Sequence, residues 1–348
     1  WIEDIRRDPK TNYVSENDID DFGQQFLQLQ YTRLISNKTS ITNSLYYGGA
    51  GGDFPFGLDD GAGGFNQLNY PLYNNHYGLL STVNYESDRL SLDGGIHAYT
   101  FRRVNEEANI PAISTPYYSD ESQKDEISGF AKAQYSLGKL KISGDLQVRA
   151  VQLAFAPATE FLGFDASIPD RTWTFVNPKI GVSYVIDNRK LVYASFGRTG
   201  REPTRADILA TSFIGPDNLA EVQNTNSVKA EYVNNLEIGA RMSTDRYAIN
   251  ANIFYMDFEN EIAPIGVFVP EIFGSLRENI ASSQRYGVEL DLSFKPTDNI
   301  DFGGFATYMQ GNIDELTLGG SNEVLRDREQ TLTPRWTTQQ FIQYGGND

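Results

Sequence analysis

The sequence predicts an all-β protein, specifically part of a large antiparallel transmembrane β-barrel with about thirteen strands in this chain. Segments of about 11–15 residues alternate apolar and polar side chains, which is the period of a strand whose two faces meet different surroundings. The connections between these segments are alternately very short and very long, which is typical of barrels with short periplasmic turns and long extracellular loops. No run of 18 apolar residues is present, so a transmembrane helix is not expected.

The composition agrees with this fold and excludes several kinds of site. The 348 residues include 20 Tyr, 21 Phe and 31 Gly, which suit a β-rich wall, and no Cys, so no disulfide or thiolate site is expected. The mean hydropathy of −0.43 resembles that of a soluble protein, but barrel strands hide their membrane signal because every second residue faces the lumen. The net charge of −17 argues against nucleic acid as a partner.

The clearest strand runs from Gln284 to Lys295. One set of its side chains is predicted to face lipid, namely Tyr286, Val288, Leu290, Leu292 and Phe294. The other set is predicted to face the lumen, namely Arg285, Gly287, Glu289, Asp291 and Ser293. A slip of one residue would place Glu289 and Asp291 in hydrocarbon, so the register of this strand is strongly specified.

Twelve further strands complete the prediction. Three alternate clearly, at 89–104, 140–152 and 246–258. The weaker nine lie near 23–35, 39–49, 73–86, 123–137, 172–186, 190–199, 232–243, 299–312 and 334–345. Aromatic residues support the arrangement, since interfacial girdles are expected beside the turns and loops. The girdle candidates are Tyr85, Tyr135, Tyr184, Tyr247, Phe294, Trp173 and Trp336.

The connections fall into two classes. The short ones, rich in Gly, Asn and Asp, which favour tight turns, are 36–38, 86–88, 138–139, 187–189, 244–245 and 296–299. The long ones are 50–72, 105–121, 156–171, 200–231, 263–282 and 313–333. Loops of such length are normally functional, and a soluble β-sandwich does not give this strict alternation.

The segment 191–207 reads LVYASFGRTGREPTRAD, and it is followed in order by NNLEIG at 234–239, ANIFYMDF at 251–258, NI at 279–280 and RYGVEL at 285–290. This series resembles the strand motifs that recur late in the barrel of TonB-dependent outer-membrane receptors. The resemblance is firm over about 190–310 and compatible with the remainder of the chain.

The resemblance implies a 22-stranded barrel with a plug in its lumen, of which this chain supplies roughly strands 7 to 19. We therefore expect residues 1–348 to be a fragment of a single barrel domain, without the plug domain and without the final strands. The odd strand count agrees with a fragment, because bacterial single-chain barrels are even-stranded; a missed strand is the alternative. No signal peptide opens the chain, which also suggests a removed leader or a piece of a longer protein.

Catalytic and metal chemistry is not expected. The two histidines, His76 and His97, lie in predicted strands, and their separation in the sequence matches no metal-ligand spacing, so a structural or lumen-lining role is favoured over metal binding. No nucleophile–base arrangement stands out among the acidic residues, and the glycine clusters lack a phosphate-binding pattern. We expect no catalytic residues, no metal site and no cofactor.

The candidate substrate-binding residues lie on the inward face near the outer mouth. They are Tyr99, Phe101, Arg103, Arg198 and Arg285. Arginine in a shielded lumen suits carboxylates and other anionic chelates, and aromatic rings give flat contact area to a bulky ligand. The alternative is that these arginines pair with lumen acids such as Glu237 and Asp291, or with the plug.

The resemblance implies uptake of a scarce, bulky nutrient across the bacterial outer membrane, with an iron–siderophore complex favoured and cobalamin or haem next. It also implies energy coupling through the TonB–ExbB–ExbD complex, by way of a plug segment that is not in this chain. Outer-membrane lipid and lipopolysaccharide would surround the barrel, and a surface lipoprotein is a further candidate partner. Two alternatives remain open at this point: a passive porin or diffusion channel, and a soluble secreted glycan-binding β-protein.

Overall fold

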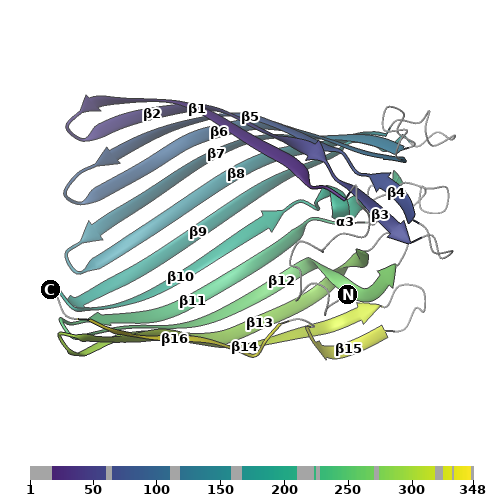
Figure 1. The fold of residues 1–348 in the computed structure, drawn as a ribbon. Helices are drawn as coiled ribbons and strands as arrows, with labels where there is room; N and C mark the ends of the chain where they lie inside the picture. Colours follow the sequence, from purple (N-terminus) through teal and green to yellow (C-terminus); the bar gives the residue numbers. More distant parts are fainter. Residues whose placement is uncertain are drawn as a thin grey trace.

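The computed structural model describes residues 18–59, 65–109, 118–157, 167–209, 223–224, 228–269, 274–317, 324–330 and 333–345. Its strands form one antiparallel sheet that curves into an open trough (Figure 1). The short turns lie at one end of the trough and the long connections at the other. No helix in these ranges is long and apolar enough to cross a membrane. The predicted all-β architecture is confirmed.

The strands of the wall follow one another in chain order. They are β1 (Asp21–Ser36), β2 (Thr39–Asp53), β5 (Leu72–Glu86), β6 (Leu90–Asn109), β7 (Tyr118–Leu137), β8 (Leu140–Pro157), β9 (Arg171–Asp187), β10 (Lys190–Arg201), β11 (Glu231–Ser243), β12 (Tyr247–Val269), β13 (Gly274–Thr297), β14 (Ile300–Thr317), β15 (Val324–Glu329) and β16 (Trp336–Tyr344). Both β15 and β16 pair with β14. A hairpin of β3 (Pro55–Asp59) and β4 (Phe65–Asn69) and a short helix, α3 (Arg205–Leu209), lie in the long connections. Each predicted strand coincides with a strand of the wall.

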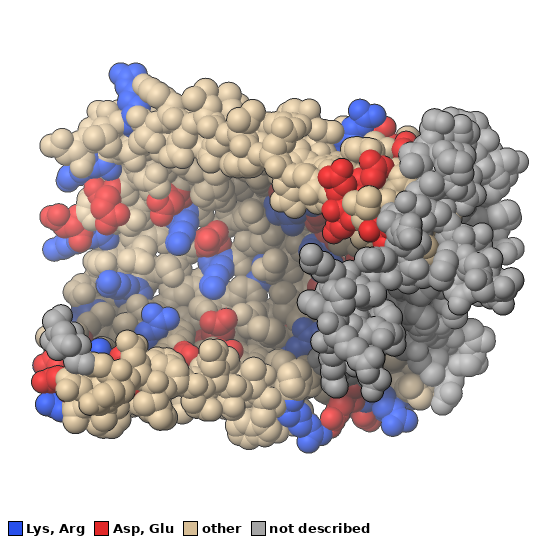
Figure 2. Space-filling view, in the orientation of Figure 1, with Lys and Arg blue, Asp and Glu red and all other residues tan. Residues whose placement is uncertain are grey.

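The register of β12 and β13 confirms the predicted faces. Ile253 lies opposite Val288 and Ala251 lies opposite Leu290, while Asn252 lies opposite Glu289. Apolar residues therefore share one face and polar residues the other. Val288 and Leu290 are 47% and 43% exposed, so they lie on the outer surface and not in a closed protein core. Figure 2 shows Lys, Arg, Asp and Glu side chains interspersed over the hollow inner face.

Several strands continue further at the outer end than the sequence predicts. The sequence predicts a loop over 263–282, but β12 and β13 pair through Pro264 and Arg277 up to Val269 and Gly274. Parts of 50–72, 105–121 and 313–333 are likewise strands. Beyond the membrane both faces of a strand meet water, so the apolar–polar alternation disappears although the backbone ladder continues.

Two tyrosine rings on the inner wall lie across a glycine of the neighbouring strand in the same way. Tyr46 of β2 lies over Gly78 of β5, and Tyr193 of β10 lies over Gly239 of β11; a Cβ atom at either glycine would collide with the ring. The missing side chain lets each ring reach the next strand but one, where Tyr193 donates a hydrogen bond to Asn252. Such pairs fill the space above a strand glycine and fix the neighbouring strands in register.

The girdle prediction is supported on the turn side and wrong at one position. Tyr135, Tyr184 and Phe294 are exposed beside the short turns, and Trp336 is exposed after a long connection. Trp173, in contrast, pairs with Val151 and has the same alternation as the buried Phe175, which places it on the inner face. A one-residue offset decides the face of a strand residue, and position near a loop does not reveal that offset.

A charge on the outer face tests the assignment of faces. Leu290→Arg places a guanidinium near the middle of the apolar band, and we expect it to reduce the free energy of unfolding by about 2–4 kcal/mol. Thr307→Arg, which adds the same charge opposite Glu289 on the inner face of β14, is the control and should change it little. The measurement is urea unfolding of the full-length protein in lipid vesicles; equal losses for both variants would contradict the assignment.

Candidate functional site

The structure brings the five predicted substrate-binding residues together in two separate groups, and it places Tyr99, Phe101, Arg103 and Arg285 on the inner face. Arg198 has the alternation of the exposed Val192 and Phe196 in its strand, so alternation does not place it on that face. Tyr99, Phe101 and Arg103 follow one another on the inner face of β6, opposite Gly78, His76 and Asn74 of β5. Arg198 lies on β10 and Arg285 on β13, several strands away. In the described part of the chain no recorded contact joins the two groups, so they form two distinct regions of the wall.

The first group belongs to a connected cluster of rings, which we call the aromatic cluster. Its members are Phe26, Tyr46, His76, His97, Tyr99 and Phe101. The His76 ring lies 5.0 Å from that of Tyr99 and 5.9 Å from that of Phe101, and both contacts are edge-to-face. Edge-to-face contacts at such distances are favourable beyond the area they bury. Four adjacent strands, β1, β2, β5 and β6, therefore present one continuous aromatic surface to the lumen.

A hollow of about 380 Å³ lies beside the aromatic cluster. Its lining includes Phe26, Asn74, His76 and Phe101, together with the backbone at Gly48 and Gly49. A volume of this size lies in the range of small-molecule sites, and apolar rings with a few amide groups are the usual lining of such sites. This hollow can take a flat or aromatic group of a ligand.

An ion-pair network borders the cluster. Tyr99 donates a hydrogen bond of 2.9 Å to Glu126, which also accepts one of 2.7 Å from Arg149. Arg149 pairs with Glu202 at 3.2 Å, and Lys124 donates to Glu202 as well. Burial raises the pKa of the Glu202 carboxyl, but the hydrogen bond from Lys124 and the charges of Lys124 and Arg149 outweigh burial and hold that pKa below its usual value.

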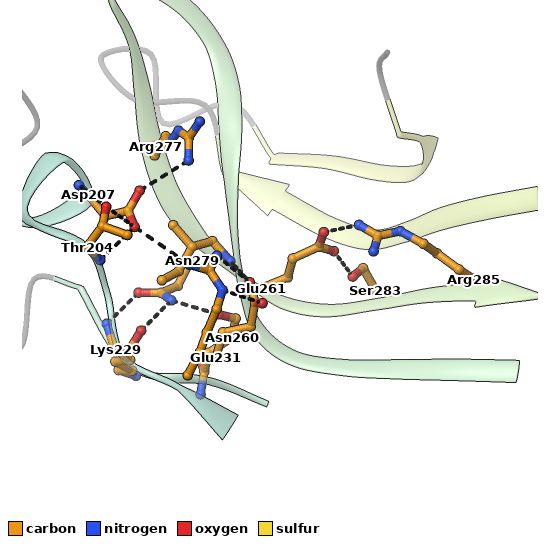
Figure 3. A network of polar contacts seen from close by, with 12 residues as sticks. Thr204, Asp207, Lys229, Glu231, Asn260, Glu261, Arg277, Asn279, Ser283 and Arg285 are labelled. Carbon is orange, nitrogen blue, oxygen red and sulfur yellow. Dashed lines mark hydrogen bonds and ion pairs between the residues drawn. The ribbon is translucent and has the colours of Figure 1, made fainter. Parts of the chain in front are cut away.

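Glu202 begins a segment, 202–209, that folds against the inner wall after β10. The segment contains α3, whose first turn is capped reciprocally: Thr204 Oγ1 donates to Asp207 at 2.7 Å and the Asp207 amide donates back at 3.2 Å. Asp207 is 1% exposed and pairs with Arg277 of β13 at 3.3 Å (Figure 3). The chain is held again at Lys229, whose amide donates to Asn279 at 2.7 Å. We call residues 202–209 the inward segment.

The arginines of the second group are already paired with acids. Arg198 donates to Glu259 at 2.8 Å and lies over the ring of Tyr232. Arg285 pairs with Glu261, and it donates to Gln330 at 2.7 Å. The alternative of acid-paired arginines therefore describes their state in this structure. The partners, however, are Glu259 and Glu261, whereas Glu237 and Asp291 were the expected acids.

Arg103 has no acid partner among its recorded contacts in the described ranges, and it donates to Asn105 at 2.8 Å. It stands above Phe101 on the same face of β6, next to the hollow. Of the predicted arginines it is the one that lies beside the aromatic cluster.

Three further residues, Tyr46, His76 and His97, belong to the site, and no sequence motif singles them out. Alternation places Tyr46, His76 and His97 on inward faces, but it does not show that they meet. Tyr46 Oη lies 3.3 Å from His76 Nε2 and 2.9 Å from His97 Nε2. The signal that could have found this contact is the pairing of β2, β5 and β6, which places Tyr46 opposite Gly78 and Gly78 opposite Tyr99.

Comparisons with solved structures show the same fold in longer chains. Copper transporter OprC matches with a TM-score of 0.75 and 16% identity over 94% of this chain and 50% of that chain. The ferric citrate transporter FecA matches at 0.68 and 11% over 93% and 47%, and the ferric yersiniabactin uptake receptor FyuA from Yersinia pestis matches at 0.66 and 13% over 92% and 46%. The chain thus spans about half the length of these proteins.

The sequence comparisons identify the family. No curated protein sequence matches the chain. The sequence model described as "TonB dependent receptor-like, beta-barrel" matches residues 3–347, which is nearly the whole chain, and the sheet has the fold of solved receptors of this kind. The chain therefore belongs to the TonB-dependent receptor-like β-barrel family of the bacterial outer membrane.

Proposed function

We propose that the chain forms part of the wall of an active-transport receptor for a scarce, bulky nutrient, with an iron–siderophore complex favoured and cobalamin or haem next. The observation that carries this proposal is the aromatic cluster with its adjoining hollow, on the inner wall of a barrel of this family. Of the three proteins compared above, two are named for ferric complexes and one is named for copper. No covalent chemistry is needed for such a function.

Both groups of predicted substrate-binding residues would contact the ligand, each in a different way. Tyr99 and Phe101 provide flat faces for aromatic or conjugated groups of the chelate, and Arg103 provides donors for its anionic oxygens. Arg198 and Arg285 contribute when a ligand carboxylate replaces Glu259 or Glu261 as their partner. An exchange of one carboxylate for another leaves the charge pairing intact, so the guanidinium is never left uncompensated.

The outer membrane lacks an energy source of its own, so active uptake needs a distant one. We propose that a plug segment outside this chain couples the barrel to the TonB–ExbB–ExbD complex. Residues 1–348 then contribute one portion of a single barrel domain. Lipid and lipopolysaccharide contact the outer face, and a surface lipoprotein remains a candidate partner at the long loops.

The rival functions require different surroundings for the outer face or the lumen. A soluble glycan-binding protein would not expose a row of residues such as Val288, Leu290 and Ile253 to water. A passive porin would share the exposed row, but it needs neither a ligand site nor energy. Energy dependence therefore separates the proposed function from a diffusion channel.

Replacement of residues 205–227 by a short Gly-Ser linker tests the role of the long connection after β10. Much of this connection lies outside the described residues, but both of its described ends are tied to the inner wall. We expect affinity for a ferric siderophore to fall at least about tenfold, which corresponds to ~1.4 kcal/mol, because the capturing surface is lost. The protein should still fold, as shown by its heat-modifiable mobility in gels. Unchanged affinity would count against capture by this connection.

Energy dependence is tested in cells that produce the full-length receptor. Uptake of the radiolabelled ferric chelate should stop when TonB is deleted or a protonophore collapses the inner-membrane gradient, while binding to the cells persists. A TonB-deleted strain that takes up the chelate at the original rate would support the porin alternative.

Protonation of Glu202 at acid pH should release the inward segment from the inner wall. The pKa of Glu202 is lower in the folded state than in the unfolded state. Its contribution to the stability of the folded segment is therefore complete above the unfolded pKa of about 4.3, and it is lost as the pH falls through the lowered, folded-state pKa. We expect protease cleavage within the inward segment to rise below about pH 4 in the native protein, and Glu202→Gln to show raised cleavage already at pH 7. Glu315→Gln removes an exposed pair with Arg326 and is the matched control. If Glu202→Gln is cleaved at pH 7 no faster than this control, Glu202 does not hold the inward segment against the wall.

A further inference from the structure

We propose that Tyr46, His76 and His97 form a binding site for a single transition-metal ion on the inner wall. The inference rests on the convergence of one phenol oxygen and two imidazole nitrogens, donated by three adjacent strands, β2, β5 and β6. It does not depend on the nutrient that the whole receptor takes up. The described ranges contain no group of three or more His, Cys, Asp or Glu side chains that could hold a metal ion. The proposed site is not a group of that kind, because it has two histidines and its third ligand is a tyrosine.

The distances from the phenol oxygen to the two imidazole nitrogens fit a coordination shell. Tyr46 Oη lies 3.3 Å from His76 Nε2 and 2.9 Å from His97 Nε2. A tetrahedral ion with bonds of about 2.0–2.1 Å to imidazole nitrogen and to oxygen has ligand atoms about 3.3 Å apart. These two distances therefore match those expected if bonds to one ion replaced the two hydrogen bonds.

The wall holds the three side chains in place before any ion arrives. Tyr46 reaches His97 only because its ring crosses Gly78, which has no side chain to block it. The Tyr99 ring lies 5.0 Å from that of His76 and 5.3 Å from that of His97, so it packs against both imidazoles. Preorganised donors lose little conformational entropy on binding, which favours affinity.

The donor set selects the class of ion. Neutral imidazole suits copper, zinc, nickel and iron, and a phenolate oxygen adds a negative charge to the shell. On binding, the Tyr46 hydroxyl gives up its proton to solvent as the oxygen–metal bond forms, so one proton is released for each ion bound. His76 lines the hollow, so a water molecule or a chelate oxygen can approach the proposed ion from that side as a fourth ligand.

Copper(II) is the probe for the experiment, titrated into the purified full-length receptor in detergent without any siderophore. We expect one ion per chain, nitrogen hyperfine splitting from two imidazoles in the electron paramagnetic resonance spectrum, and a phenolate-to-copper charge-transfer band. His76→Gln and His97→Gln should each weaken binding at least tenfold. Tyr46→Phe should abolish the charge-transfer band and also weaken binding.

Matched variants separate a metal site from a merely structural contact. Tyr193→Phe removes the hydroxyl of the equivalent ring over Gly239, where the partner is Asn252 and not histidine, and it should bind copper as the native protein does. Gly78→Val keeps all three donors in the sequence but displaces the Tyr46 ring, so it should lose the charge-transfer band.

Native-like spectra and affinity in Tyr46→Phe, or copper bound without imidazole nitrogen, would overturn the proposal. Heat-modifiable mobility verifies that each variant is folded. Copper is titrated without chelate and without TonB, so failure of the transport experiments leaves this result unaffected, and the reverse also holds.

Discussion

The constraint on which the structure depends is the satisfaction of backbone hydrogen bonds in a medium without water. Hydrocarbon offers no partner for an amide or a carbonyl, so a chain that crosses it with strands must pair each strand with its neighbours. The antiparallel ladders between β1 and β16 meet this demand for the strands inside the sheet, and they continue beyond the apolar band into the outer end of the wall. Once the ladders exist, each strand has one face toward lipid and one toward the lumen.

The same ladders bring together residues that are far apart in the sequence. Tyr46, His76 and His97 lie within hydrogen-bond distance because β2, β5 and β6 are neighbours in one register. Lys124 of β7 and Arg149 of β8 likewise lie on paired strands, and Glu202 of the inward segment contacts both. The chemistry of the inner wall is therefore a product of strand pairing, and local sequence motifs contribute little to it.

Charges on the inner wall are largely compensated by one another. Arg285 is paired with Glu261, and Glu126 pairs with Arg149. Arg198 is paired as well, with the more exposed Glu259. A partly buried charge that lost its partner would be costly, so an anionic ligand can bind such arginines only by exchange. The aromatic cluster carries no such cost, since rings bind flat groups without breaking an ion pair. This difference explains why the proposed chelate contacts centre on Tyr99 and Phe101.

The sequence by itself determined the fold class, the position of every wall strand except β15 and the face of most strand residues. It could do so because lipid on one side and water on the other impose a period of two, which Val288, Glu289 and Leu290 display directly. Only the tertiary structure decided where the strands end, since that period disappears where both faces meet water. It also decided which acids pair with the arginines and that two histidines share the hydroxyl of Tyr46. Those contacts depend on the register between strands and on the space above Gly78. The spacing of residues along the sequence predicts neither of them.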